Sequence, residues 1–170
     1  MAMFAGNSIK MSRSKVVVND EFMTPKIAWE NIKQYIPKDK IIWEAFNGDG
    51  SSARHLEELG FSVTFSDEDF FECDYGDVIV SNPPFSKIRK IIPRLSELDK
   101  PFILIMPAQK LFTSYIREWK DKKLQLIIPR KRIPFNKLAE DGTYEKYSTA
   151  IDCFYYCYKM DLKKDINWIE

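Results

Sequence analysis

The chain has 170 residues, of which 26 are Lys or Arg and 25 are Asp or Glu, so its formal net charge is only +1. Three cysteines without a CxxC pair and a single histidine argue against a disulfide framework and a zinc site. No apolar run approaches the length of about 20 residues that crosses a bilayer. We therefore expect a protein of the cytoplasm, or of the host cytoplasm if the chain is viral, with no metal and no membrane partner.

A chain of this length predicts a single domain. Residues 1–20 have neither an apolar core nor a cleavage site of a signal peptide, and we expect them to form a flexible N-terminal lead-in. Residues 21–160 are expected to form the one domain, and the polar residues 161–170 a C-terminal tail or a short terminal helix.

Hydrophobic periodicity and turn residues divide the domain into alternating helices and strands. Thr24-Pro25 is a helix start signal, Gly60 a helix end signal, and Pro93 predicts an interruption or kink in a helix. The expected helices are residues 27–36, 53–60, 86–98 and 108–120. The expected strands are residues 40–46, 61–67, 77–82, 101–107, 124–129 and 150–160.

This order of elements predicts an α/β fold. Strands that are apolar throughout, such as residues 102–106, and that alternate with helices indicate a Rossmann-like, doubly wound, mostly parallel sheet. The aromatic strand 150–160 has no helix before it, which predicts a C-terminal antiparallel hairpin at one side of the sheet.

Three of the expected strands end in segments suited to ligand binding, because open α/β sheets bind ligands beyond the carboxyl ends of their strands. The first leads into WEAFNGDG, residues 43–50, whose glycines allow the backbone to approach a ligand closely. The second ends at Asp67, a carboxylate placed to accept hydrogen bonds from a ribose. The third runs into Asn82-Pro83-Pro84-Phe85, where two prolines must end the strand.

The segments DEFMTPKIAWENI, WEAFNGDG, SDEDFF and SNPPFSK, in this order, resemble the motifs of S-adenosylmethionine-dependent amino-methyltransferases. The resemblance is closest to the small phage and bacterial DNA adenine-N6 methyltransferases, and it covers roughly residues 20–130. It implies a class I methyltransferase fold, S-adenosylmethionine as cofactor, S-adenosylhomocysteine as product and site-specific methylation of adenine in DNA. Two departures from the family are the short stretch between the second and third strands, which predicts that one edge strand is lacking, and Ala45 in place of a common proline.

The tetrad Asn82, Pro83, Pro84 and Phe85 is the expected catalytic element. The Asn82 side-chain oxygen and the Pro83 carbonyl can accept the two hydrogens of an adenine amino group and aim its lone pair at a methyl donor. Phe85 can stack on the base, which must be flipped out of a duplex to reach it. The alternative is a Pro-Pro turn in which Phe85 belongs to the core and Asn82 caps the next helix.

The resemblance also assigns residues to the cofactor. Thr24 would meet its carboxylate, Glu44 its amine and Asp67 its ribose, although Glu68 remains an equal candidate for the ribose. The remaining residues that the resemblance implies for the loop and the adenine are Phe46, Gly48, Gly50, Asp69 and Phe70. Alternatives are that Thr24 caps the first helix and that Phe46 or Phe70 is plain core.

Nucleic acid, and DNA above all, is the expected partner. Residues 115–137 carry 8 basic and 2 acidic side chains, although such a run is more often a solvated surface. Within residues 130–148 we expect the phosphate contacts from Arg130, Lys131 and Arg132, and a second stacking face for the base from Tyr144 or Tyr147. Nothing resembles a separate recognition domain, so a partner subunit or self-association could supply target recognition.

Three other functions remain open. An RNA adenine-N6 methyltransferase would use the same tetrad. A protein glutamine methyltransferase is disfavoured, because those enzymes carry an N-terminal recognition domain for which the lead-in leaves no room. A non-catalytic subunit that binds cofactor or nucleic acid would show binding without turnover.

Overall fold

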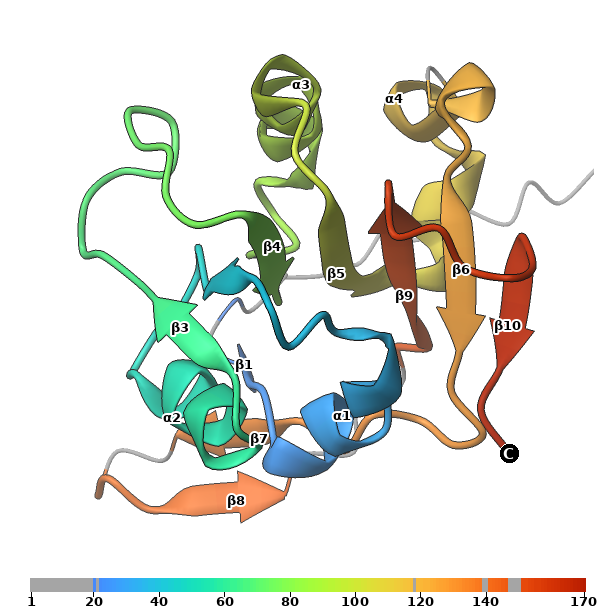
Figure 1. Ribbon diagram of the computed structural model, residues 1–170. Helices are drawn as coiled ribbons and strands as arrows, with labels where there is room; N and C mark the ends of the chain where they lie inside the picture. Colours follow the sequence, from blue (N-terminus) through green and yellow to red (C-terminus); the bar gives the residue numbers. More distant parts are fainter. Residues whose placement is uncertain (1–19, 21, 118, 139–140, 147–150) are drawn as a thin grey trace, which may run out of the picture.

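The computed structural model describes residues 20, 22–117, 119–138, 141–146 and 151–170 (Figure 1). Its main layer is a seven-stranded sheet of order β10-β6-β9-β5-β4-β2-β3. The strands are β2 (Ile41–Trp43), β3 (Ser62–Thr64), β4 (Val78–Ser81), β5 (Phe102–Pro107), β6 (Gln125–Ile128), β9 (Cys153–Tyr158) and β10 (Ile166–Trp168). Only β9 runs antiparallel to its neighbours β5 and β6, so the sheet is mostly parallel.

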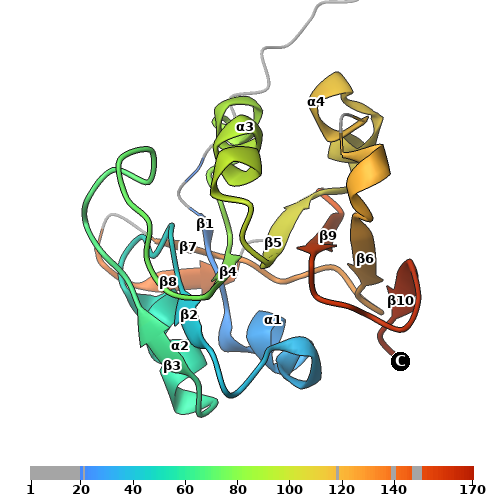
Figure 2. The ribbon, with the colours of Figure 1, turned by 45° about the horizontal axis from the view of Figure 1, so that its top comes forward.

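Short helices cover both faces of this sheet. Figures 1 and 2 show α1 and α2 on one side of it and α3 and α4 on the other. The α-helices are α1 (Lys26–Glu30), α2 (Ser51–Glu58), α3 (Ile88–Leu98) and α4 (Ser114–Arg117), and the 3-10 helices are η1 (Lys33–Tyr35), η2 (Ala108–Phe112) and η3 (Lys120–Lys122). Among the described residues, no helix has the length and apolar character that crossing a bilayer requires.

The centre of the sheet is the core of the protein. Every residue of β4 and β5 is buried, because helices cover both faces of these strands. The aromatic strand β9 adds two buried phenols whose hydroxyl groups both find acceptors. Tyr155 donates to the carbonyl of Ala28 (2.6 Å) and Tyr156 to the carbonyl of Pro107 (2.9 Å). These bonds tie β9 to α1 and to the end of β5.

The architecture confirms the expected α/β, doubly wound, mostly parallel sheet with antiparallel pairing near the C-terminus. The stretch 65–77 contains no strand, so β3 forms the edge of the sheet, in agreement with the expected loss of an edge strand. Two expectations are corrected. β9 lies inside the sheet between β5 and β6 and not at its side, and residues 166–168 form the edge strand β10 where a tail or helix was expected.

Two helices are shorter than their periodicity suggests. The expected helix 27–36 is divided into α1 and η1, because the backbone of Ile32 leaves the helical region at φ −116°. The expected helix 108–120 becomes η2, α4 and η3, because Thr113 adopts an extended conformation and donates its hydroxyl to the carbonyl of Lys110 (2.5 Å). By contrast, α3 continues through Pro93.

A second, smaller sheet has no counterpart in the sequence-based expectations. It consists of β1 (Phe22–Met23), β7 (Asn136–Leu138) and β8 (Tyr144–Lys146), in the order β1-β7-β8 with antiparallel pairing. β1 pairs with β7 in the register Phe22↔Lys137. The N-terminal segment and the basic segment after β6 are therefore joined by backbone hydrogen bonds.

The turn before β4 is held against β2 at close range. The N–H of Ile41 donates to Asp77 Oδ2 (2.8 Å), and the N–H of Asp77 donates to the carbonyl of Ile41 (2.7 Å). Gly76 has φ +57°, and a Cβ at this position would lie 2.8 Å from the carbonyl oxygen of Ile41. This turn thus requires glycine both for its conformation and for the space it occupies.

Gly76→Ala should lower the free energy of unfolding by about 3 kcal/mol, because it adds a steric clash with backbone to the strain of a positive φ. The matched control is Gly60→Ala, since Gly60 has φ +91° and nothing within 4 Å of the added Cβ. That variant should lose only about 1 kcal/mol. Urea unfolding of both variants measures the difference, and equal losses would contradict the close packing of Gly76 against β2.

Candidate active site

A cavity of about 340 Å³ opens at the carboxyl edge of the sheet. It lies where the strand order reverses, because β2 has β3 on one side and β4 on the other. Its volume is in the lower part of the range that holds a drug-sized ligand. The residues that line it are 20, 22–24, 45–48, 51–52, 66–67 and 82–85. The cavity thus joins the loops after β2, β3 and β4 to the N-terminal strand β1.

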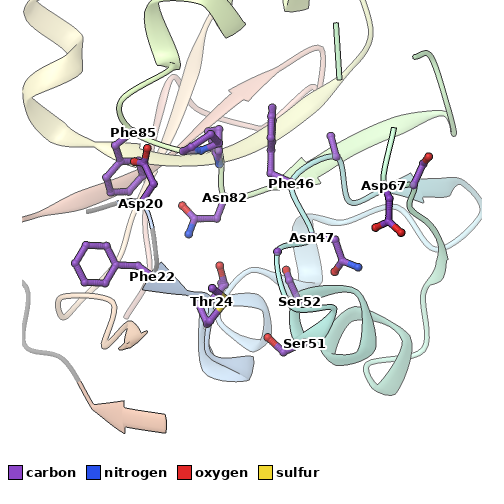
Figure 3. Close-up of a pocket in the computed structure, with 16 residues that line it drawn as sticks. Asp20, Phe22, Thr24, Phe46, Asn47, Ser51, Ser52, Asp67, Asn82 and Phe85 are labelled. Atoms are coloured by element: carbon purple, nitrogen blue, oxygen red, sulfur yellow. The ribbon is translucent and has the colours of Figure 1, made fainter. Parts of the chain in front are cut away.

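The lining residues fall into two groups on either side of Asn82 (Figure 3). Phe22, Phe85 and Asp20 lie on one side of the Asn82 amide. Phe46 and Asp67 lie on the other side, towards α2. We call the first side the amide end of the cavity and the second the loop end.

Asn82 follows β4 directly and carries the most unusual polar group of the site. Its Oδ1 atom is buried and has no hydrogen-bond partner among the residues that the structure describes. A buried polar atom left unpaired costs about 1–3 kcal/mol, so such atoms in native proteins commonly mark a ligand or water position. Asn82 does not cap the following helix, since the N-cap of α3 is Lys87. The structure thus places an unused buried acceptor on a side chain that lines the cavity.

The rest of the tetrad surrounds this acceptor. Pro83 is buried, Pro84 is half-buried, and both line the cavity. Phe85 also lines the cavity although it is only 8% exposed. Its ring meets that of Phe135 edge to face, with 6.3 Å between the ring centroids. Phe85 therefore belongs to the core and to the cavity wall at once.

Four of the eight expected cofactor residues line the cavity, namely Thr24, Phe46, Gly48 and Asp67. Thr24 is buried and lies just before Pro25, which is the N-cap of α1. Gly48 has φ +59°, and a Cβ there would come within 3.3 Å of the sulfur of Met23. A side chain at this position would be strained by the positive φ and would crowd Met23 in β1, so glycine is favoured here.

The structure separates the two carboxylates at the end of β3. Asp67 lines the cavity, whereas Glu68 accepts hydrogen bonds from the hydroxyl groups of Ser66 (3.2 Å) and Tyr75 and from the thiol of Cys73 (3.4 Å). These bonds lower the pKa of Glu68, the bond from Tyr75 most of all. Of the two candidates, Asp67 is the one that faces the cavity.

Four expected cofactor residues are not at the cavity wall. Gly50 is the N-cap of α2 with φ +84°, and Asp69, in the loop between β3 and β4, accepts the N–H of Phe71 (3.1 Å). Phe70 is 5% exposed and packs behind Phe46, with 4.8 Å between the ring centroids. Glu44, the fourth, is completely buried.

Glu44 lies beneath the loop end and connects three segments. It accepts hydrogen bonds from the hydroxyl groups of Ser52 and Ser81 and from the N–H of Phe46 (3.2 Å). Burial raises the pKa of its carboxyl group to about 7, although these three hydrogen bonds oppose the rise. Because Ser52 and Phe46 line the cavity, Glu44 acts on it through them.

The expected phosphate contacts lie at the same edge of the sheet as the cavity. Arg130 and Lys131 are exposed and follow β6, which runs in the same direction as β4. Arg132 is also exposed but forms an ion pair with Asp152, with 2.6 Å between Nε and Oδ1. None of the three lines the cavity.

Of the two tyrosines expected to stack on the nucleobase, the structure describes only Tyr144. Tyr144 lies in β8 and donates its hydroxyl to Asp49 in the loop after β2, and it does not line the cavity. This bond helps to lower the pKa of Asp49, against the opposing effect of burial. Tyr147 lies outside the described residues.

Several residues at the site were missed from the sequence. Ser51, Ser52 and Asn47 sit in or directly after the glycine motif, so their neighbourhood was visible in the pattern. Asp20 and Phe22 belong to the DEFMTP motif, of which only Thr24 was assigned. No local signal could have placed Phe135 beside Phe85, since 50 residues separate them in the chain.

Comparisons with known proteins identify the fold. No protein-family model matches the chain, and no curated protein sequence matches it. Among solved structures, it is similar to a proposed RNA methyltransferase from Pyrococcus horikoshii, with 13% identity, a TM-score of 0.50, and coverage of 81% of this chain and 86% of that one. It is also similar to the 23S rRNA methyltransferase ErmE, with 11% identity, a TM-score of 0.51, and coverage of 81% and 69%. The chain has the fold of class I methyltransferases.

The buried Glu44 should make stability depend on pH. Its carboxyl group keeps a proton in the folded protein up to about pH 7, whereas the unfolded chain releases it near 4.5. Between these two pH values the folded state binds more protons than the unfolded chain. The contribution of Glu44 to the free energy of unfolding therefore falls as the pH rises from 4.5 to 7 and stays constant above pH 7. The total change is on the order of 3 kcal/mol.

Urea unfolding of the wild type and Glu44→Gln between pH 5 and pH 8 checks this expectation. Glutamine does not titrate, so the wild type should lose stability relative to the variant as the pH rises. The difference between the two proteins isolates Glu44 from the other titrating groups. A difference that stays constant across the range would show that the carboxyl group is ionised throughout.

Proposed function

We propose that the protein is an S-adenosylmethionine-dependent methyltransferase that methylates the N6 amino group of adenine in DNA. The observation that carries the proposal is the buried Oδ1 of Asn82, which has no partner among the described residues and belongs to a side chain that lines a cavity in a class I methyltransferase fold. An exocyclic amino group has two hydrogens to donate, and Asn82 Oδ1 with the carbonyl of Pro83 would accept them.

The two acceptors would compensate for the weak nucleophilicity of the adenine amino group. The lone pair of an aromatic amine is delocalised into the ring, which makes the nitrogen a poor nucleophile. Two acceptors on the amino hydrogens draw the nitrogen towards tetrahedral geometry and direct its lone pair away from the ring. The attacked nitrogen is cationic and releases a proton readily, so the site requires no strong base. The two prolines hold the acceptors with little conformational entropy left to lose.

The loop end of the cavity fits the cofactor. Asp67 offers a carboxylate to a ribose, Phe46 offers an aromatic face, and Ser51 and Ser52 bring the N-terminus of α2 to the cavity. S-adenosylmethionine would supply an electrophilic methyl group at the boundary with the amide end. Asn82 lies between the two ends, where the amine and the methyl group have to meet.

A nucleic acid is the proposed substrate because of the shape of the cavity and the basic residues near it. A base within a duplex cannot reach a cavity lined by Pro83, Pro84 and Phe85, so it would be extruded. The exposed Arg130 and Lys131 at the same edge of the sheet would neutralise phosphates. RNA is the second candidate, because two of the similar solved structures carry the names of RNA methyltransferases. Competition between DNA and RNA in a methylation assay separates the two.

Asn82→Ala should reduce methyl transfer from labelled S-adenosylmethionine to DNA by at least about 100-fold, since the amine loses its orienting acceptor. Binding of S-adenosylhomocysteine, measured by calorimetry, should change little, because the loop end is intact. Scintillation counting of DNA and RNA substrates in parallel also identifies the preferred nucleic acid. Undiminished transfer by the variant would rule out the proposed role of Asn82.

Arg130→Gln with Lys131→Gln should weaken nucleic-acid binding at every sequence and flatten its dependence on salt. Loss of two phosphate contacts reduces the slope of log K against log salt by about 1.5 to 2. The matched control is Lys163→Gln with Lys164→Gln, which removes the same charge from exposed positions before β10, at the opposite edge of the sheet. Fluorescence anisotropy over a salt series measures the salt dependence of binding for both double variants. Equal effects of the two pairs of substitutions would show that Arg130 and Lys131 are not part of the nucleic-acid interface.

A further inference from the structure

We propose that Phe22 forms the second aromatic wall of the base-binding site, opposite Phe85, and that Asp20 is the positioning residue for this wall. The inference rests on the proposed function, which places an extruded base at the amide end of the cavity. It assigns the second stacking face to the N-terminal strand β1, and not to Tyr144 or Tyr147.

The first support is a shared aromatic neighbour. Phe135 is almost completely buried, and its ring lies 6.2 Å from that of Phe22 and 6.3 Å from that of Phe85. Phe22 and Phe85 both line the cavity, whereas Phe135 does not. Phe135 therefore supports both lining rings from the core, and Figure 3 shows these two rings on the same side of the Asn82 amide.

The second support is the way in which β1 is fixed. Its pairing with β7 in the register Phe22↔Lys137 places Phe22 beside the segment that carries Phe135. On the other side, Asp20 accepts the N–H of Ser86 (3.1 Å) with Oδ1 and the hydroxyl of Ser86 with Oδ2. Ser86 directly follows the tetrad. Asp20 thus ties the N-terminal segment to the loop that presents Asn82 and Phe85.

The third support is the chemistry of the enclosed space. Two aromatic rings that line one end of a cavity suit a flat aromatic ligand, which can stack on them. Asn82 Oδ1 is an acceptor without a partner among the described residues at this end, whereas both oxygens of Asp20 already accept from Ser86. Acceptors favour a ring that carries an amino group over one that carries a carbonyl in the same place. The combination selects an extruded aminopurine or aminopyrimidine, of which adenine is the proposed substrate.

The test uses a single-stranded oligothymidylate with one central 8-vinyladenine, which keeps the 6-amino group and loses fluorescence when it stacks. The full-length protein is titrated into this probe in the presence of S-adenosylhomocysteine. The variants are Phe22→Leu, Phe22→Tyr, Phe85→Leu, Asn82→Ala and Asp20→Ala with its conservative partner Asp20→Asn. Phe112→Leu is the matched control, since Phe112 is 77% exposed and does not line the cavity.

The wild type and Phe112→Leu should quench the probe. Phe22→Leu and Phe85→Leu should each bind it about 5- to 100-fold more weakly and leave it brighter at saturation. Phe22→Tyr should behave as the wild type, because it keeps the ring. Asp20→Ala should weaken quenching, and Asp20→Asn should restore it through the acceptor for the Ser86 N–H. All variants should bind S-adenosylhomocysteine with wild-type affinity, which also shows that they are folded.

Two results would overturn the inference in distinguishable ways. If Phe22→Leu matches the wild type while Phe85→Leu and Asn82→Ala bind weakly, then β1 is not a wall of the base site and the proposed function stands. If none of these three variants alters quenching, or if the wild type does not quench the probe at all, then the amide end takes no base. The proposed function then fails together with the inference.

Discussion

The carboxyl group of Glu44 is the point at which the parts of the candidate site are joined. Ser52 at the start of α2, Ser81 at the end of β4 and the N–H of Phe46 after β2 all donate to it. Ser81 is the residue before Asn82, so one buried side chain fixes the loop end and the amide end relative to each other. Buried networks whose members are all paired restrict a structure to one arrangement, which a transfer between two bound groups requires.

The hydrogen bonds that Glu44 accepts keep its carboxyl group below the cavity surface. Glu44 has no exposed surface, and Ser52 stands between it and the cavity while also accepting the indole N–H of Trp29 (3.0 Å). The family resemblance assigns Glu44 to the methionine amine, whereas in this structure its carboxyl group has no exposed surface and accepts from Ser52. With its pKa raised to about 7 by burial, the carboxyl group is poorly suited to act as a permanent negative charge. Its main contribution in this structure is to position Phe46, Ser52 and Ser81.

The sequence was most informative where structure is determined locally. Apolar strands followed by glycine or proline punctuation placed β2, β4 and their terminal motifs correctly, because those residues act through their own backbone conformations. Helix lengths were overestimated at residues 27–36 and 108–120, where Ile32 and Thr113 leave the helical region despite a suitable periodicity. The position of β9 between β5 and β6 could not be inferred, because nothing in a strand's own residues specifies its neighbours.

The two ends of the cavity also differ in how far local sequence determines them. The loop end is built from consecutive strand-to-helix connections, whereas the amide end requires β1, the tetrad and Phe135 to be assembled from distant parts of the chain. The segment after β6 takes part in both. Its strand β7 pairs with β1 beside Phe22, and Tyr144 in β8 donates to Asp49 in the loop after β2. This double attachment explains how the segment can shape the site although none of its described residues, 130–138 and 141–146, lines the cavity.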